Sequence, residues 1–410
     1  MRNIATLSQL VIYRNLLDDP LMQSLERLLS VACEPSVEYE LTASLFKAAE
    51  KLGLSGNLWQ SYLIYRITQD ENIFTVAVEK NKGHINDSLR RAVLHDLSVV
   101  LSVLTLQPMP ACSELISTFT PSTTAVSDAL HSLMTFVLSQ DITPERLLNK
   151  LIAFYLQYGS GATAGFKAFR WEDGTGLVGI SHTDTIALDD IIGYDTQKAV
   201  LIQNTEAFIA GRPANNVLLA GARGTGKSSS VKALINRYYS DGLRLVEVPR
   251  HQLQHLNTII ETLRQSSQKF IIFLDDLSFE EAETDYKYLK SIIDGGIEAK
   301  PANVLLYATS NRRHLVKESW SDRADSDDIH TADSVQEKIS LVDRFGITIT
   351  FQTPDQNEFL RIVNGIARRN SIALPEEELK RAALRWEMSR SGRSGRVARQ
   401  FVTHLLSQKS

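Results

Sequence analysis

Apolar residues recur at intervals of three and four over the first part of the chain, which is the spacing of amphipathic helices. Two runs show it most clearly: Val37, Leu41, Leu45, Ala48 and Leu52, and Leu89, Val93, Leu97, Val100, Leu101 and Leu104. A further helix is predicted from Thr143 as N-cap and Pro144 at the first helical position to Gly159. Residues 1–158 are therefore predicted to form an all-α N-terminal domain of about five to seven helices.

The pattern changes at YGSGATAG, residues 158–165, where glycine interrupts the helical periodicity. Two short apolar stretches then flank Asp173 and Gly174, as in a β-hairpin. We predict that residues 159–185 form a hinge and a hairpin between two domains.

From residue 186 to residue 353, short apolar runs alternate with helical patterns. The predicted strands are NVLLA, LRLVEV, KFIIFLDD and NVLLYATS, and the predicted helices span residues 227–239, 253–265 and 285–293. Such alternation is typical of a parallel sheet covered by helices on both faces, so this part is predicted to be a three-layer α/β core. After Pro354 the pattern is helical again, which predicts a C-terminal helical region over residues 354–410.

Composition narrows the class of protein. The 410 residues are 43% hydrophobic and 22% charged, with a formal net charge of −4, so the chain is predicted to be globular without an overall attraction to nucleic acid or anionic membranes. The two cysteines, Cys33 and Cys112, lack the spacing of a metal site or a disulfide framework. No apolar stretch has the length of a membrane span, and the N-terminal sequence lacks a signal-peptide pattern. We expect a cytoplasmic protein.

The stretch GARGTGKSSS, directly after NVLLA, carries a recognisable chemistry. Gly221, Gly226, Lys227 and Ser228 match the phosphate-loop pattern G-x-x-x-x-G-K-[ST] between a predicted strand and a predicted helix. Glycines let backbone N–H groups face an anionic phosphate at the helix N-terminus. Lys227 is expected to reach the β- and γ-phosphates, and the Ser228 hydroxyl to ligate Mg²⁺. The predicted nucleotide-binding residues of this loop are Gly221, Gly224, Thr225, Gly226, Lys227, Ser228 and Ser229.

Two carboxylates end the predicted strand KFIIFLDD. Asp275 is expected to hold the magnesium through water, and Asp276 is expected to orient the attacking water. Paired acids at a strand end also occur as simple helix caps. Their place downstream of a phosphate loop favours the metal and water roles.

Together these motifs resemble those of the AAA+ ATPase superfamily over residues 186–410. Residues 188–211 resemble its adenine-binding segment, YATSN its sensor-one strand, DRFG its arginine-finger segment and SGRSGRVARQF its sensor-two lid. The resemblance implies these roles: Ile191, Ile192 and Tyr194 at the adenine, Asn311 at the attacking water or γ-phosphate, Arg344 as arginine finger, and Arg396 or Arg399 as sensor-two arginine. The combination of LDDLSF, SNRRHL and DRFG is most similar to a bacterial AAA+ family of unknown function.

The resemblance also implies a P-loop AAA+ core with a helical lid, ATP or ADP and Mg²⁺ as cofactors, and a homo-oligomer that forms a ring or an open ring. Two positions depart from the AAA+ pattern. Asp276 stands where most members have glutamate, and its shorter side chain implies slow hydrolysis. The lid motif fits either Arg396 or Arg399, which lie on one helical face at i and i+3, so both are retained.

These predictions favour an ATPase that remodels or recruits an unidentified partner protein held by residues 1–158. The aromatic–apolar–glycine loop of protein-threading AAA+ unfoldases is absent from VEVPRHQLQHLNTII. One alternative is a DNA-associated loader or initiator, because such ATPases also lack the threading loop. Arginines recur every third residue at Arg390, Arg393, Arg396 and Arg399, as in a nucleic-acid-binding stripe. The acidic total charge and the lack of interleaved aromatic residues make nucleic acid the less favoured partner. The other alternative is an ATP-sensing scaffold that barely hydrolyses, consistent with Asp276.

Overall fold

The computed structural model describes residues 6–30, 35–122, 128–139, 142–161, 164–180, 183–264, 266–277, 289, 292–293, 301–311, 344–372, 374–390 and 392–408. The chain divides into two compact units. The helical unit comprises Met1–Gly165 and Gln265–Gln268, and the α/β unit comprises Phe166–Arg264 and Lys269–Ser410. The division falls inside the segment 159–185 that was predicted to be a hinge and a hairpin.

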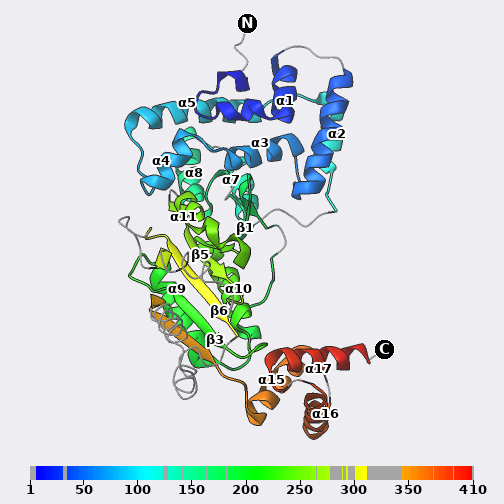
Figure 1. The fold of residues 1–410 in the computed structure, drawn as a ribbon. Coiled ribbons are helices and arrows are strands. Elements are labelled where there is room, and N and C mark those ends of the chain that lie inside the picture. Colours follow the sequence, from blue (N-terminus) through cyan, green and yellow to red (C-terminus); the bar gives the residue numbers. More distant parts are fainter. Residues whose placement is uncertain are drawn as a thin grey trace. The chain divides into compact units, whose positions relative to one another are not determined.

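The helical unit is a bundle around one apolar core (Figure 1). Its described helices are α1 (Pro20–Ser30), α2 (Pro35–Leu52), α3 (Leu58–Gln69), α4 (Ile73–Lys80), α5 (Asp87–Leu104), α6 (Ser113–Thr118), α7 (Asp128–Val137) and α8 (Pro144–Tyr158). This is more than the predicted number, because α4 and α6 are too short to produce a periodic apolar run. The predicted N-cap of α8 is present, since the hydroxyl of Thr143 accepts a hydrogen bond from the Arg146 N–H at 3.3 Å.

Residues 266–268 belong to the helical unit, although they follow α11 (Leu256–Arg264) in sequence. The Glu79 carboxylate accepts hydrogen bonds from the N–H and the hydroxyl of Ser160, at 2.9 and 2.8 Å, and from the hydroxyl of Ser266 at 3.2 Å. The Gln268 side chain, 1% exposed, donates to the carbonyl of Tyr155 at 3.0 Å. This attachment was not predicted from the sequence.

The α/β unit contains one seven-stranded sheet of order β2-β1-β4-β5-β6-β3-β7. Its strands are β1 (Ala168–Glu172), β2 (Gly176–Gly179), β3 (Val217–Gly221), β4 (Leu243–Glu247), β5 (Lys269–Leu274), β6 (Val304–Ser310) and β7 (Ile347–Phe351). Every neighbouring pair is parallel except the antiparallel hairpin β1–β2. The predicted parallel sheet is therefore confirmed.

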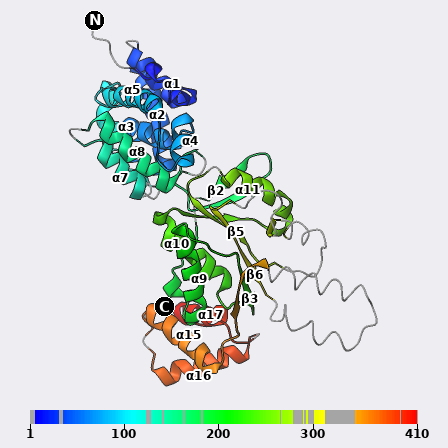
Figure 2. The ribbon, with the colours of Figure 1, turned by 90° about the vertical axis from the view of Figure 1, so that its left-hand side faces the viewer.

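Helices cover both faces of this sheet (Figure 2). On one face, Leu219 packs in a core with residues of α9 (Asp195–Ile209) and α10 (Lys227–Tyr238). On the other face, Leu218 packs in a core with residues of α11, including Ile259. Successive residues of β3 thus point into opposite cores, and both cores are apolar, which explains the near-continuous apolar strands in the sequence.

Three helices follow β7: α15 (Gln356–Arg369), α16 (Glu376–Met388) and α17 (Gly395–Ser407). They share an apolar core that includes Phe359, Ile362, Ala383 and Phe401. The fold class predicted from the sequence, a three-layer α/β core with a C-terminal helical region after an all-α region, is confirmed.

Three details differ from the sequence-based expectation. The hairpin is not a separate element, because β1 pairs in parallel with β4 and extends the sheet. Strand β7 was not predicted, because it is only half buried and its threonines interrupt the apolar pattern. The region predicted as helix 253–265 begins with a 3₁₀ segment, Arg250–His255, before α11. The predicted helix 285–293 lies outside the described residues, apart from 289 and 292–293.

Within the described parts of the chain, none of the helices combines the length and the apolar character that crossing a membrane requires.

Candidate nucleotide-binding site

A pocket of about 490 Å³ lies where the sheet meets the lid, within the size range of small-molecule sites. It opens at the carboxyl ends of the neighbouring parallel strands β5, β6 and β3, the edge at which α/β proteins bind ligands. It is lined by Asp190, Ile191, Ile192, Tyr194, Arg223, Gly224, Thr225, Gly226, Lys227, Ser228, Ser229, Asp275, Asp276, Thr309, Asn311, Ile362, Ile366, Gly395, Arg396 and Arg399.

The backbone of the loop between β3 and α10 requires glycine at two positions. Gly221 has φ +139°, and a Cβ there would overlap the carbonyl of Phe351 on the adjacent strand β7. Gly224 has φ +78°, and a Cβ there would lie 2.9 Å from the Cβ of Arg396. Glycine at 221 lets two backbones approach closely, and glycine at 224 leaves room for the lid.

Lys227 is the first helical residue of α10 and only 5% exposed. Its ammonium donates to the carbonyls of Gly221 at 2.9 Å and Ala222 at 2.8 Å, and to Oδ1 of Asn311 at 3.2 Å. Burial lowers the pKa of Lys227 to about 8. The charge of Arg396 contributes to this lowering, whereas the nearby carboxylates oppose it. A buried cation at a helix N-terminus is a strong site for an anion.

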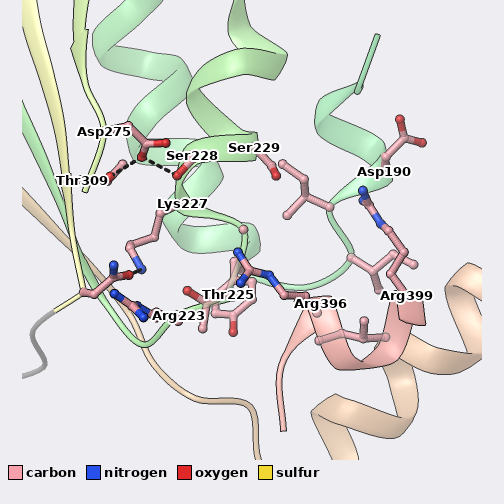
Figure 3. Close-up of a pocket in the computed structure, with 18 of the residues that line it drawn as sticks. Asp190, Arg223, Thr225, Lys227, Ser228, Ser229, Asp275, Thr309, Arg396 and Arg399 are labelled. Carbon is pink, nitrogen blue, oxygen red and sulfur yellow. Dashed lines mark hydrogen bonds between the residues drawn. The ribbon is translucent and has the colours of Figure 1, made fainter. Parts of the chain in front are cut away.

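Asp275 follows β5 and meets two hydroxyls. Ser228 and Thr309 both donate to its Oδ1, each at 2.6 Å (Figure 3). The phosphate-loop serine, the first acid and strand β6 are thus joined at one carboxylate oxygen.

Asp276, the second acid, has the left-handed φ of +54°. Its N–H donates to the Thr309 hydroxyl at 2.8 Å, and its Oδ1 accepts a hydrogen bond from the side-chain amide of Asn311. Arg223 lies 3.8 Å from its other oxygen. The side chain is more than half exposed, so it faces the open part of the pocket.

The two lid arginines point in different directions (Figure 3). The guanidinium of Arg396 is directed toward Thr225 in the phosphate loop, and the Arg396 N–H donates to the carbonyl of Gly224 at 3.1 Å. Arg399 is directed toward Asp190. Both line the pocket, and the charge of Arg396 contributes to the lowered pKa of Lys227. The backbone of Arg396 is thus joined directly to the phosphate loop.

The other end of the pocket is apolar. Ile191 and Ile192 meet Ile362 and Ile366 of α15 there, and Ile192 packs against the lid core. Tyr194, with φ +56°, donates its hydroxyl to the carbonyl of Gln352 at 2.8 Å. The segment before α9 and the helix α15 together form an apolar surface suited to a flat base.

Most of the residues predicted from the sequence meet in this pocket. Gly221 contributes through the loop that it begins rather than as a lining residue, and Arg344, just before β7, is not among the lining residues that the structure describes. Sequence reasoning missed Asp190, Arg223, Thr309, Ile362, Ile366 and Gly395. Thr309 lies in the quoted motif YATSN, two residues before the predicted Asn311, so the strand pattern could have indicated it.

The sequence model of a family described as "Protein of unknown function (DUF815)" matches residues 164–409, more than half of the chain. The chain belongs to the DUF815 family. The match begins just before the hairpin β1–β2 and includes every residue that lines the pocket. It also agrees with the sequence-based expectation that the chain is most similar to a family of unknown function. No curated protein matches this DUF815 chain in sequence.

Solved structures similar to the DUF815 chain include RuvB of Thermotoga maritima, described as a Holliday junction branch migration motor. The identity is 17%, the match covers 54% of this chain and 64% of RuvB, and the TM-score is 0.36. Two variants of the same protein match with 17% identity and a TM-score of 0.36, over 54% and 55% of this chain and 64% and 65% of theirs. The DUF815 chain thus spans less than two thirds of the length of these structures.

Proposed function

We propose that this DUF815 protein binds ATP with Mg²⁺, hydrolyses it to ADP and phosphate, and uses the cycle to remodel or recruit a partner protein. One observation carries the proposal: a continuous chain of hydrogen bonds links the phosphate-loop lysine and serine to both acids. Its members are Ser228, Asp275, Thr309, Asp276, Asn311 and Lys227. A simple helix cap would not bring a buried lysine, two acids and an amide together in one pocket.

The residues present fit a magnesium nucleotide. The hydroxyl of Ser228 and the carboxylate of Asp275 are the hard oxygen donors that Mg²⁺ takes alongside phosphate and water. Residues 223–229 of the phosphate loop line the pocket, and Lys227 supplies a buried positive charge. When bound, Mg²⁺ would neutralise charge on the phosphate oxygens.

The chain's own groups supply the remaining chemistry. Asp276 faces the open pocket, where its carboxylate can accept a hydrogen bond from a water and orient it toward the γ-phosphate. Asn311 holds that carboxylate from the side of β6. Lys227 and Arg396 offset the charge of the phosphates. Arg344 does not line this chain's pocket, so we assign it to the pocket of a neighbouring copy in a homo-oligomeric ring or open ring.

The lid supports a coupling between nucleotide and movement. Arg396 of α17 and Ile362 of α15 both line the pocket, so a bound nucleotide would contact lid and core together and favour their closure. The lining residues that the structure describes all come from the α/β unit, and we assign the binding of a partner to the helical unit. We place this activity in the cytoplasm, where ATP and Mg²⁺ are supplied.

Phosphate release by the full chain tests the proposal, measured with ATP in the presence of Mg²⁺ and again with the metal chelated. We expect turnover only with Mg²⁺, and none in Lys227→Ala, which should also fail to bind ATP. Lys232→Ala is the matched control, because Lys232 lies on the same helix and pairs instead with Glu247 at 3.9 Å. Wild-type ATP affinity in Lys227→Ala would exclude the phosphate-cradle assignment.

An ATP-sensing scaffold is the second candidate, and Asp276 is the observation that favours it. Its carboxylate is shorter than the usual glutamate and already bonded to Asn311, so hydrolysis is expected to be slow. A single-turnover measurement distinguishes the two functions. Bound ATP that persists without conversion to ADP would identify a scaffold.

A further inference from the structure

A single hydroxyl group, that of Thr309, bonds to both acids of the site. It donates to Oδ1 of Asp275 at 2.6 Å and accepts the backbone N–H of Asp276 at 2.8 Å. A threonine hydroxyl has one hydrogen to donate, so the acid receives it and the oxygen lone pairs remain for the N–H. The side chain is only 2% exposed, and the hydroxyl is therefore held in this arrangement.

These bonds extend the sheet past the end of β5. The last paired residues of β5 and β6 are Leu274 and Ala308. One residue farther along, Thr309 faces Asp275, and its carbonyl accepts the N–H of Leu277 at 2.7 Å. The chain from Asp275 to Leu277 is thus attached to Thr309 at three successive residues.

The attachment compensates for an unfavourable backbone. Asp276 has a φ of +54°, a left-handed conformation that residues other than glycine seldom adopt. Such conformations persist only where surrounding interactions fix them, and they cluster at functional sites. The bonds to Thr309 on either side of the Asp276 α-carbon are the described interactions that fix it.

We propose that Thr309 is a positioning residue for ATP hydrolysis, an inference that rests on the proposed function. Its hydroxyl fixes the Asp275 oxygen that faces Ser228, and so prepares the magnesium site. The same hydroxyl fixes the backbone from which the Asp276 carboxylate reaches the water. Thr309 therefore aligns the metal and the water sites with each other through its bonds to the two acids.

The test compares Thr309→Val, which keeps the shape and removes the hydroxyl, with Thr309→Ser, which keeps the hydroxyl. Ser310→Ala is the matched control, because the neighbouring Ser310 hydroxyl is fully buried on the same strand and makes no hydrogen bond within the described structure. Loss of an outer partner of a metal ligand costs about 10- to 100-fold in metal affinity or activity. We expect a loss of this size in Thr309→Val, both in turnover and in the Mg²⁺ concentration needed for half-maximal nucleotide binding, and recovery of most of it in Thr309→Ser.

Two further readouts separate positioning from folding. At the assay temperature, nucleotide affinity without metal and far-ultraviolet circular dichroism, which reports the folded fraction, should be the same in Thr309→Val and Ser310→Ala. In the ligand-free protein, the amide of Asp276 should exchange its hydrogen faster in Thr309→Val than in wild type, since it has lost its acceptor.

Three outcomes would overturn the inference: unchanged Mg²⁺ dependence and turnover in Thr309→Val, equal losses in Thr309→Val and Ser310→Ala, or no recovery in Thr309→Ser. Failure of the proposed function is a different result. If wild type binds magnesium nucleotide but does not hydrolyse it, the Mg²⁺ dependence and the amide exchange still decide the role of Thr309.

Discussion

Lys227 and Asn311 are hydrogen-bonded across the pocket, with 3.2 Å between Nζ and Oδ1. Asn311 turns its amide nitrogen to the other side and donates to Asp276. One asparagine thus joins the cation expected to bind phosphate to the acid expected to orient water. Lys227 already uses its three donors on Asn311 and on two loop carbonyls, so an arriving phosphate must replace at least one of these bonds.

The lowered pKa of Lys227 predicts that nucleotide binding is coupled to proton uptake. Because Lys227 has a pKa of about 8, its side chain is neutral in a large fraction of the ligand-free molecules at pH 8 to 9. A bound triphosphate favours the charged lysine, so nucleotide binding in this range should take up a proton. Calorimetry in buffers of different ionisation enthalpy measures that uptake. The uptake should disappear well below pH 8, where Lys227 is already charged before ATP binds, and an uptake that persists there would assign the proton to another group.

The same shift predicts how the stability of the ligand-free protein depends on pH. The folded-state pKa of Lys227 is lowered, so between pH 8 and about 10.4 the unfolded chain binds more protons than the folded one. The contribution of this lysine to the free energy of unfolding therefore rises with pH through that window. Subtracting the pH profile of Lys227→Met from that of wild type isolates it, and a difference that falls with pH would contradict the assignment.

Asp276→Asn should retain ATP and lose hydrolysis, because an amide keeps the shape but cannot accept the proton of the water. A loss of about 10²- to 10⁴-fold in turnover is expected for a group with this role. Asp173→Asn is the control, since it makes the same change at an exposed residue of the hairpin. Unchanged turnover in Asp276→Asn would mean that another acid orients the water, such as Glu280 or Glu281, which lie outside the described residues.

Arg396→Ala should weaken ATP binding more than Arg399→Ala does. A hydrogen bond to a charged group contributes about 1.5 to 3 kcal/mol, which corresponds to a loss of roughly ten- to hundredfold in affinity. Competition binding of ATP against a fluorescent analogue measures both variants, each serving as the control for the other. A larger effect of Arg399→Ala would transfer the sensing role to that residue.

Arg344 is predicted to act on the site of a neighbouring copy, so two inactive variants should complement each other. Asp276→Asn keeps its arginine but lacks a working site, whereas Arg344→Ala keeps its site but lacks the arginine. An arginine supplied by a second subunit contributes about 10³ to 10⁵ in rate, so the mixture should exceed the sum of its parts. Its activity should also rise with protein concentration.

The control for this mixture is the chain that carries both changes, which should restore neither single variant. Subunit exchange is measured separately, by energy transfer between labelled chains. If the labelled chains exchange and the mixture of single variants stays inactive, Arg344 acts within its own chain or only holds an interface together.

Local motifs could be predicted because the residues that carry their chemistry are consecutive in the sequence. Lys227 and Ser228 lie next to each other, and the loop geometry follows from their glycine neighbours. The role of Thr309 depends instead on the register of β6 against β5, which no single segment contains. The proposed preference for Arg396 over Arg399 likewise rests on the packing of α17 against the phosphate loop, because both residues fit the same motif.

The same limit applies to the fold. The alternation of strands and helices predicted a parallel sheet, because fully buried strands such as β5 read as continuous apolar runs. It did not show that β1 lies beside β4, nor that residues 266–268 attach to the helical unit, since both are contacts between segments far apart in sequence. Half-buried edge strands such as β7 carry a weaker pattern than the central ones.

The pairing of β1 with β4 has a consequence for dissecting the protein. The sheet ends on this side in β2, a strand of four residues that begins and ends with glycine and offers little for another molecule to pair with. A fragment cut at residue 186 would lack β1 and β2, and β4, a strand buried at every residue except Glu247, would become the margin of the sheet. Its unpaired backbone groups would then be open to strands of other molecules. Such a fragment should aggregate, whereas one that begins before Ala168 keeps the margin covered.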